Sequence, residues 1–403
     1  MATTTSELSS VPTAADATNT QRRALVALGL GTFVGTLVFI IPPLFFPQMA
    51  AELNVSVPLL GQTTSLMMAL SVVLAIVVGP LADRAGYRPL IVGGLISASI
   101  CFLAFVLAPI FPILLLASAA GALTDASVNG PSYALAGTAF SSAGARRAIG
   151  VASAAQAGSA IVGVPLLVAI GSAAGWRTAF VVAGILAVLV VVPAQRWLPH
   201  RQQRSAGPLS LAAIAAPYQP LLQNLKMRRL LGATVLGAFV WSGLLTYLGA
   251  FLVQNLALAP GPVGIVYIVV GFGYVAGSLA VGGPLSRVSG RRLVVAGFLG
   301  CALCFGLAFS ALAPPVVAVA LLTATAAFAG VESVAMAAVL NAETPVGAGA
   351  TMSLNGSLFN LGAAGGSAVG GVLLATAGYG AMAVGLPLFG IAAALLAWRS
   401  QRA

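Results

Sequence analysis

A short polar turn flanked by long apolar runs occurs twice in this chain. The first copy covers residues 79–88, and the second covers residues 283–292, which begin 204 positions later. Each copy reads Gly-Pro-Leu, then polar residues, then a glycine and an arginine. One half of the chain therefore repeats the other, and each turn joins two segments that avoid water.

The composition indicates that a lipid bilayer surrounds these segments. Of the 403 residues, 60% are hydrophobic and 6% are charged, whereas a soluble domain carries about 25% charged residues. Backbone groups inside lipid must pair with one another, so each span should be helical. We therefore predict an all-α membrane protein with twelve transmembrane helices in two pseudo-symmetric six-helix bundles. The predicted spans are 24–46, 59–82, 89–108, 111–139, 149–172, 177–197, 230–254, 262–285, 292–312, 315–341, 350–375 and 379–398.

The spans divide the chain into four parts. Residues 1–23 are poor in apolar runs and are predicted to form a disordered cytoplasmic tail. Residues 24–197 form the first predicted bundle, 198–229 a proline-containing cytoplasmic linker, and 230–399 the second bundle. The only histidine, His200, lies in the linker and is not expected to relay protons.

The basic residues predict the orientation. With the N-terminus inside, seventeen of the 18 lysines and arginines fall on the cytoplasmic side, and only Arg177 falls on the other. We therefore expect a multi-pass protein of the bacterial inner membrane with both termini in the cytoplasm. The basic residues are scattered at the ends of apolar runs, so the net charge of +11 does not indicate a nucleic-acid partner.

The repeat extends beyond the turns. Gly175-Trp176 opens the sixth span and Gly378-Tyr379 opens the twelfth, while Asp125 and Glu332 lie 207 positions apart in the fourth and tenth spans. A near-constant offset predicts two bundles of like topology, related by an axis along the membrane normal, with a binding site between them near the midplane.

These residues resemble the major facilitator superfamily over positions 24–398. The stretch from Gly79 to Pro89 fits the signature between the second and third helices of that family. Within the family, the chain looks most like the twelve-helix drug:proton antiporters that export sugars, purine nucleosides and chloramphenicol. Residues 158–165, 175–180, 246–252 and 360–371 carry this finer match, whereas residues 117–121 lack the Arg and Gln that the fourth helix of that group often has.

Two acidic residues, Asp125 and Glu332, lie well inside predicted spans. A charge at that depth costs at least ~2.5–3.5 kcal/mol, so intramembrane acids are usually functional. We interpret both as sites for a coupled proton or for a cationic group of the substrate. The alternative is a neutral acid that is hydrogen-bonded to a neighbouring helix, and for Asp125 the adjacent Thr124, Ser127 and Asn129 could provide those bonds.

The resemblance also implies a gate on the cytoplasmic side. An aspartate at the position of Asp83 would pair with an arginine and with the start of the eleventh helix, and Arg146 and Arg147 are candidate partners. The alternative is a charge cluster that only sets topology. The predicted gating residues are Gly79, Asp83, Arg84, Gly86, Arg88, Arg146 and Arg147.

The fifth span carries a candidate bend at Gly163 and Pro165, since proline removes a helical hydrogen bond. Plain packing of a small-residue helix is the alternative. By resemblance, the first, fourth, seventh and tenth helices face the transport pathway, flanked by the fifth, eighth and eleventh. Candidate substrate contacts on them, each of which could equally be core, are Phe33, Thr36, Asn129, Gln156, Trp241, Tyr247, Tyr267, Asn355 and Asn360.

No phosphate loop, metal-ligand cluster or nucleophile–base pair stands out in the sequence. The three cysteines, Cys101, Cys301 and Cys304, lie in apolar runs and are expected to be buried small hydrophobes. We expect a monomeric secondary transporter without cofactor or metal that exports a small organic solute in exchange for protons. A proton-linked importer or a uniporter of the same fold is the first alternative, and a non-transporting membrane sensor or scaffold is the second.

Overall fold

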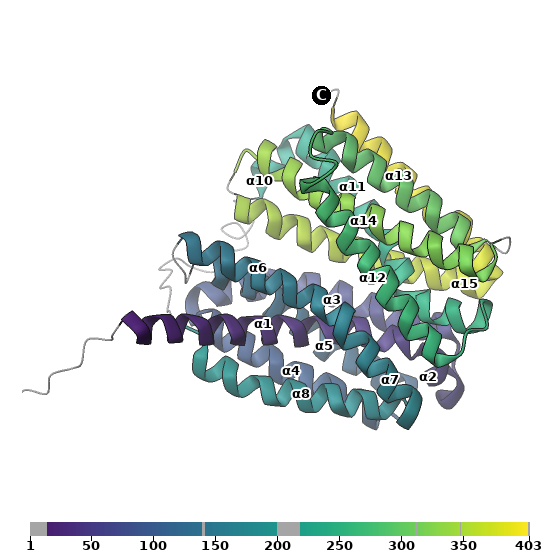
Figure 1. Ribbon diagram of the computed structural model, residues 1–403, viewed down its shortest axis with the longest axis horizontal. Helices are drawn as coiled ribbons and strands as arrows, with labels where there is room; N and C mark the ends of the chain where they lie inside the picture. The colour runs from purple at the N-terminus through teal and green to yellow at the C-terminus, as the bar shows by residue number, and fades with distance from the viewer. Residues whose placement is uncertain (1–13, 139–141, 200–217, 311–312, 347, 402–403) are drawn as a thin grey trace, which may run out of the picture.

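The computed structural model describes residues 14–138, 142–199, 218–310, 313–346 and 348–401, and within these ranges all regular structure is helical (Figure 1). The first half contains α1 (Ala14–Leu44), α2 (Phe46–Leu53), α3 (Val57–Ala85), α4 (Tyr87–Leu107), α5 (Phe111–Thr138), α6 (Ser142–Gly158), η1 (Ser159–Gly163), α7 (Val164–Ala174) and α8 (Trp176–Trp197). The second half contains α10 (Gln219–Gln223), α11 (Leu225–Ala250), η2 (Phe251–Asn255), α12 (Pro260–Gly282), α13 (Gly290–Phe309), α14 (Pro315–Glu343) and α15 (Ala348–Ser400).

The twelve predicted spans are confirmed. Eleven helical segments of the described chain are long and apolar enough to cross a membrane, and the last of them contains two spans. Its helix, α15, is interrupted at Ala377 and Gly378, where Gly378 has φ 71°. Glycine tolerates this left-handed region because it has no Cβ, so the chain can end one span there and begin the next.

The first bundle has an equivalent glycine turn, followed by an equivalent side-chain hydrogen bond. Gly175, with φ 87°, precedes Trp176 at the start of α8. The Trp176 indole donates a hydrogen bond of 2.6 Å to Glu52, and the Tyr379 hydroxyl donates one of 2.9 Å to Gln254. Both the turns and their side-chain contacts therefore follow the internal repeat.

Two segments depart from the expectation of irregular structure. α1 begins at Ala14, so residues 14–23 of the predicted tail are helical; this stretch is rich in alanine, and lengthening an existing helix needs no new nucleation. In the predicted linker, α10 forms, and α11 begins at Leu225 after the Asn224 side chain caps it by accepting from two backbone N–H groups. The rest of the tail and most of the linker, including His200, lie outside the described residues.

The two bundles meet at the end of the molecule that lies away from most of the described basic residues. In Figure 1 the first bundle runs from purple to teal and the second from teal to yellow, with α3 beside α15 and α7 beside α12. The Tyr247 side chain of α11 lies against Gly61 of α3 and Gly371 of α15. A Cβ on Gly249 would lie 3.1 Å from the Pro43 carbonyl oxygen of α1. We call Gly61, Tyr247, Gly249 and Gly371 the inter-bundle seal.

Arg177 ties three helices together at this same end. It forms an ion pair with Glu52 of α2 and donates to the backbone oxygens of Val106 (3.0 Å) and Ala108 (3.3 Å) at the end of α4. The hydrogen bonds from Arg177 and then from Trp176 lower the pKa of Glu52 below its ordinary value of 4.5. The one basic residue predicted on the far side of the membrane thus has a structural partner.

The seal predicts a conformational effect of a single added methyl group. Because a Cβ at Gly61 would clash with the Tyr247 hydroxyl, Gly61→Ala should separate the bundles at this end. Spin labels at the exposed positions Ser172 and Thr376 would report a longer distance between the bundles. Gly93→Ala, where a Cβ has nothing within 4 Å, is the matched control. Equal distance distributions for the two variants would contradict the seal.

The Glu52 ion pair predicts an acid-dependent loss of stability. A carboxylate whose pKa is lower in the folded state stabilises the fold above its unfolded pKa, and this contribution is lost as the pH falls through the folded value. The thermal midpoint of the wild type in detergent should therefore drop toward that of Glu52→Gln as the pH falls from neutral to below 4.5. Parallel pH profiles for the two proteins would show that the pair contributes nothing.

Candidate functional site

A hydrogen-bonded cluster surrounds the Asp125 carboxylate in the middle of α5. Ser71 of α3 donates to Asp125 Oδ2, and Asn129, one helical turn further along α5, donates to Oδ1 at 2.7 Å. Asn360 of α15 donates to Oδ2 at 3.0 Å and lies 3.5 Å from the Ser71 hydroxyl. We call Ser71, Asp125, Asn129 and Asn360 the Asp125 cluster.

The cluster joins the two bundles. Ser71, Asp125 and Asn129 belong to the first bundle, and Asn360 belongs to the second. The bonds that Asn360 donates to Asp125 and Ser71 cross between the bundles. A change in the charge of Asp125 would therefore act directly on the contact between them.

Among the described residues, hydrogen-bond donors surround the Asp125 carboxyl, and no basic side chain pairs with it. The ion pairs formed among the described residues are Glu52 with Arg177 and Glu343 with Arg291, both at helix ends. Three donors around one carboxylate offset part of the cost of removing it from water. The buried Oδ1 atom of Asn129 has no partner in the described structure and faces Gly35 of α1, so the cluster keeps an acceptor available.

Glu332 has different surroundings. It is half-buried on α14, and its backbone packs against Gly297 of α13. In the first bundle, Gly94 of α4, which lies 203 positions before Gly297, packs against Ser127 and Val128 of α5. The structural counterpart of Glu332 therefore lies at Ser127 or Val128 and not at Asp125, so the offset of 207 positions does not make the two acids equivalent.

Three of the predicted substrate contacts are half-buried or exposed, and each contacts a neighbouring helical segment. The Phe33 ring of α1 lies over Gly163, where a Cβ would be 3.1 Å from the ring. Trp241 of α11 stacks on Tyr274 of α12 with ring centroids 5.3 Å apart. The exposed Gln156 of α6 accepts a hydrogen bond of 3.2 Å from Tyr133 of α5.

The other predicted substrate contacts are buried or hydrogen-bonded within the protein. The buried Thr36 hydroxyl donates to the Thr32 carbonyl of its own helix at 2.8 Å, and Tyr247 donates to the Ser367 carbonyl at 2.7 Å within the seal. Asn355 accepts from Thr234 at 2.8 Å inside the second bundle. Tyr267 is buried, and its hydroxyl has no partner among the described atoms. Asn129 and Asn360 belong to the Asp125 cluster.

The predicted gate lies largely outside the described side chains. Nothing is described for the side chains of Gly79, Asp83, Arg84 and Arg146, so their pairing stays a prediction. Gly86 ends α3 with φ 84°, as a glycine after a helix often does. Arg88 is half-buried at the start of α4, and Arg147 is exposed on α6.

The predicted bend at Gly163 and Pro165 coincides with a π-helical turn, η1, directly before the proline. Such turns are a recognised cause of helix kinks. The first residue of η1, Ser159, donates a hydrogen bond of 3.0 Å to the Phe33 carbonyl of α1 and so fixes the bent helix against the first span.

Sequence reasoning missed several residues of these sites. Ser71, Tyr133, Ser153 and Tyr274 were not among the candidates, although all four make polar or aromatic contacts beside residues that were. The sequence does not show which way a serine or tyrosine within an apolar helix points. Its contacts therefore become evident only when the neighbouring helices are placed. The cysteines are free and buried, as expected.

A family model described as Major Facilitator Superfamily matches residues 28–261. This chain belongs to the Major Facilitator Superfamily. It is similar to an uncharacterized MFS-type transporter, YceJ of Bacillus subtilis (strain 168), with 26% identity over 278 residues, which are 68% of this chain and 70% of that protein.

Solved structures of the superfamily share the fold. A bacterial homologue of the human lysosomal transporter Spinster, inward-facing and unoccupied, superposes with a TM-score of 0.73 at 19% identity, covering 94% of this chain and 95% of that one. A mutant of the nucleoside transporter NupG gives a TM-score of 0.72 at 13% identity, with coverage of 94% and 99%.

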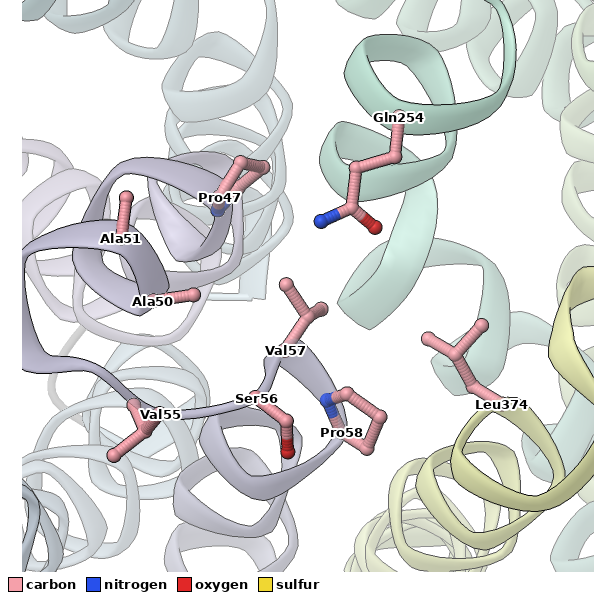
Figure 2. A pocket seen from close by; sticks show the side chains of 9 residues that line it. All are labelled: Pro47, Ala50, Ala51, Val55, Ser56, Val57, Pro58, Gln254 and Leu374. Atoms are coloured by element: carbon pink, nitrogen blue, oxygen red, sulfur yellow. The ribbon is translucent and has the colours of Figure 1, made fainter.

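A pocket of about 530 Å³ lies at the sealed end (Figure 2). Residues from α2 to the start of α3 line it from the first bundle, and Gln254 and Leu374 line it from the second. Figure 2 shows the Gln254 amide reaching between Pro47 and Leu374. The Pro58 carbonyl at its edge also lies beside Gly371, so the pocket adjoins the outer side of the seal.

The Asp125 cluster predicts an effect on the contact between the bundles. Asn360→Ala removes the hydrogen bond that crosses to Asp125, and bonds to charged groups contribute about 1.5–3 kcal/mol. The distance between spin labels at Ser172 and Thr376 should therefore broaden or lengthen. Asn355→Ala, which removes a bond inside the second bundle, should leave this distance unchanged. The same response to both substitutions would contradict a role for Asn360 between the bundles.

Proposed function

We propose that this chain is a proton-coupled secondary transporter that exports a small organic solute by alternating access. The observation that carries the proposal is the Asp125 carboxylate, which lies inside a membrane span and accepts a hydrogen bond from the opposite bundle. A proton on this carboxylate would change the charge of the site and the contact between the bundles together.

The seal supports an assignment of the conformational state. Contacts between the bundles at Gly61, Gly249 and Gly371 close one end. The opposite end carries Arg22, Arg23 and Lys226 near the starts of α1 and α11, and basic residues face the cytoplasm in membrane proteins. We therefore propose an inward-facing state in the bacterial inner membrane with both termini in the cytoplasm. The similarity to an inward-facing Spinster homologue agrees with this assignment.

The Asp125 cluster supports a role for the proton. An ionised carboxylate is an acceptor only, whereas a protonated one uses one oxygen as a donor. Protonation would weaken the bonds from Ser71 and Asn360 and so loosen the contact between α3, α5 and α15. In the exporting direction, the inward-facing protein has released its proton and accepts solute, and the outward-facing protein releases solute and takes up a proton.

Two alternatives make different predictions about the pH gradient. A proton-linked importer would accumulate solute on the same side as the entering protons, and a uniporter would be insensitive to the gradient. A membrane sensor or scaffold would show no flux. The resemblance to the drug:proton antiporters and the π-helical turn at Gly163 favour export.

Substitution of Asp125 tests the coupling. In proteoliposomes with an imposed pH gradient, Asp125→Asn should abolish uphill transport of a solute found by a thermal-stabilisation screen. Solute exchange at equal pH should persist, because the amide keeps the size and polarity of the side chain. If gradient-driven flux continued at the wild-type rate, Asp125 would not be the coupling group.

Substitution of Glu332 tests the second predicted proton site. Glu332→Gln should abolish proton-driven transport while leaving expression intact, if its carboxyl also carries a proton. The variant is informative because glutamine keeps the size of the side chain that packs against Gly297 and removes only its ability to ionise. Full activity would assign the coupling to the Asp125 cluster alone.

A further inference from the structure

Apolar and basic side chains lie together where α10 joins α11, at one end of the second bundle (Figure 1). The backbone of Asn224 is extended between them (φ −76°, ψ 115°), so α10 does not continue the axis of α11. Leu221 of α10 is fully buried, which holds α10 against the bundle, whereas Leu222 and Leu225 are 48% and 41% exposed. Two leucines therefore lie on the surface where the membrane span of α11 begins.

Three arginines lie beside these leucines. Arg228 and Arg229 follow Leu225 by three and four positions, so they share a face of α11 with it. The Arg229 guanidinium donates a hydrogen bond of 2.8 Å to the Arg399 carbonyl, so the last turn of α15 lies next to the start of α11. The Arg228 and Arg399 side chains are exposed. We call Leu222, Leu225, Arg228, Arg229 and Arg399 the basic corner.

The acids of the second bundle do not balance these arginines. The sequence of this bundle contains two acidic residues, Glu332 and Glu343. Glu332 lies well inside the span of α14, and Glu343 forms an ion pair with Arg291 of α13. The negative end of the α15 helix dipole offsets part of one positive charge. The remaining charge of the basic corner favours an anion from outside the bundle.

The exposed leucines favour a lipid over a free anion. Inorganic phosphate would leave Leu222 and Leu225 in contact with water, whereas a phospholipid covers them with its glycerol esters and upper acyl chains. The start of a membrane span also lies at the depth of the lipid phosphates. Basic clusters beside a span attract anionic headgroups, and a zwitterionic headgroup, which carries its own cation, is attracted less.

We propose that the basic corner binds the headgroup of one anionic phospholipid. Arg228, Arg229 and Arg399 bind the phosphodiester, and the acyl chains cover Leu222 and Leu225. A lipid bound in this way connects the start of α11 with the end of α15, which are the first and last spans of the second bundle. The inference does not depend on transport, since it concerns the membrane-facing surface of a single bundle.

The first bundle provides a matched comparison. Arg22 and Arg23 of α1 lie 206 positions before Arg228 and Arg229. However, α1 continues as a helix back to Ala14, so no second segment turns beside these two arginines as α10 does beside α11. The same pair of charges is therefore present without the corner, and we expect no specific lipid there.

Two lipids with the same acyl chains test the headgroup. Native mass spectrometry of the full-length protein in detergent, titrated with dioleoylphosphatidylglycerol or dioleoylphosphatidylcholine, gives the affinity for the first bound lipid. Phosphatidylglycerol should bind at least about tenfold more tightly, because each basic residue at a charged surface contributes about fivefold. Equal affinities would overturn the proposal. Displacement of the lipid by inorganic phosphate or glycerol 1-phosphate would also overturn it, since the corner would then be a site for a free phosphate.

Substitutions connect the lipid to the named arginines. Arg228→Gln and Arg399→Gln should each weaken phosphatidylglycerol binding about fivefold, and the double variant about tenfold or more. Arg228→Lys keeps the charge and should retain most of the affinity, which separates loss of charge from misfolding. Arg22→Gln combined with Arg23→Gln removes the same charge from the first bundle and should bind as the wild type does. Unchanged affinity in the Arg228 and Arg399 double variant, or an equal loss in the control, would remove the lipid from the basic corner.

The leucines give a test that does not alter the charge. Leu222→Ser combined with Leu225→Ser should weaken phosphatidylglycerol binding about three- to tenfold, because the acyl chains lose the apolar surface that they cover. Val288→Ser is the matched control, since Val288 is 40% exposed in the turn between α12 and α13, outside the basic corner. An equal loss in the control, or no loss in the leucine variant, would contradict the placement of the lipid over Leu222 and Leu225.

Discussion

The cost of an unpaired polar group in hydrocarbon governs this structure. Backbone groups meet that cost by forming helices, and the few polar side chains inside the spans meet it by bonding to one another. Asp125 is the clearest case, because its carboxylate draws donors from α3, α5 and α15. A group that must collect partners from three helices is sensitive to any movement among them, so the bonds that stabilise Asp125 also depend on how the bundles are arranged.

The internal repeat supplies two equivalent frameworks, and the departures from the repeat locate the special chemistry. The glycine turns at Gly175 and Gly378 and the side-chain contacts that follow them are nearly equivalent. Glu332, by contrast, has no acidic counterpart, because Ser127 and Val128 lie at the equivalent place in the first bundle. A carboxyl without an equivalent in the other bundle is not needed for the shared packing, which favours a role that only the second bundle performs.

Much of the fold followed from the sequence, because apolar length and turn chemistry are local properties. The spans, the bent fifth helix and the intramembrane position of Asp125 are all visible as runs, prolines and isolated acids. The partners of Asp125 are not local, since Ser71 lies 54 positions away and Asn360 lies 235 positions away. Their meeting depends on the rotation of each helix about its axis, which the apolar pattern of a membrane helix hardly constrains because lipid and protein neighbours are both apolar.

The same lack of constraint explains the mistaken pairing of Asp125 with Glu332. An offset of 207 positions differs from the structural offset of about 204 by three residues, which turns a side chain by most of a full helical rotation and moves it along the axis. Two acidic residues in corresponding helices therefore do not occupy equivalent structural positions.

The position of Asp125 bears on how one protein could couple two ligands. If a proton bound to its carboxyl and a solute bound elsewhere between the bundles, neither would need to displace the other. Each could instead bias the same equilibrium between two arrangements of the bundles. Asp125 can act on that arrangement because Asn360 donates to it from the opposite bundle.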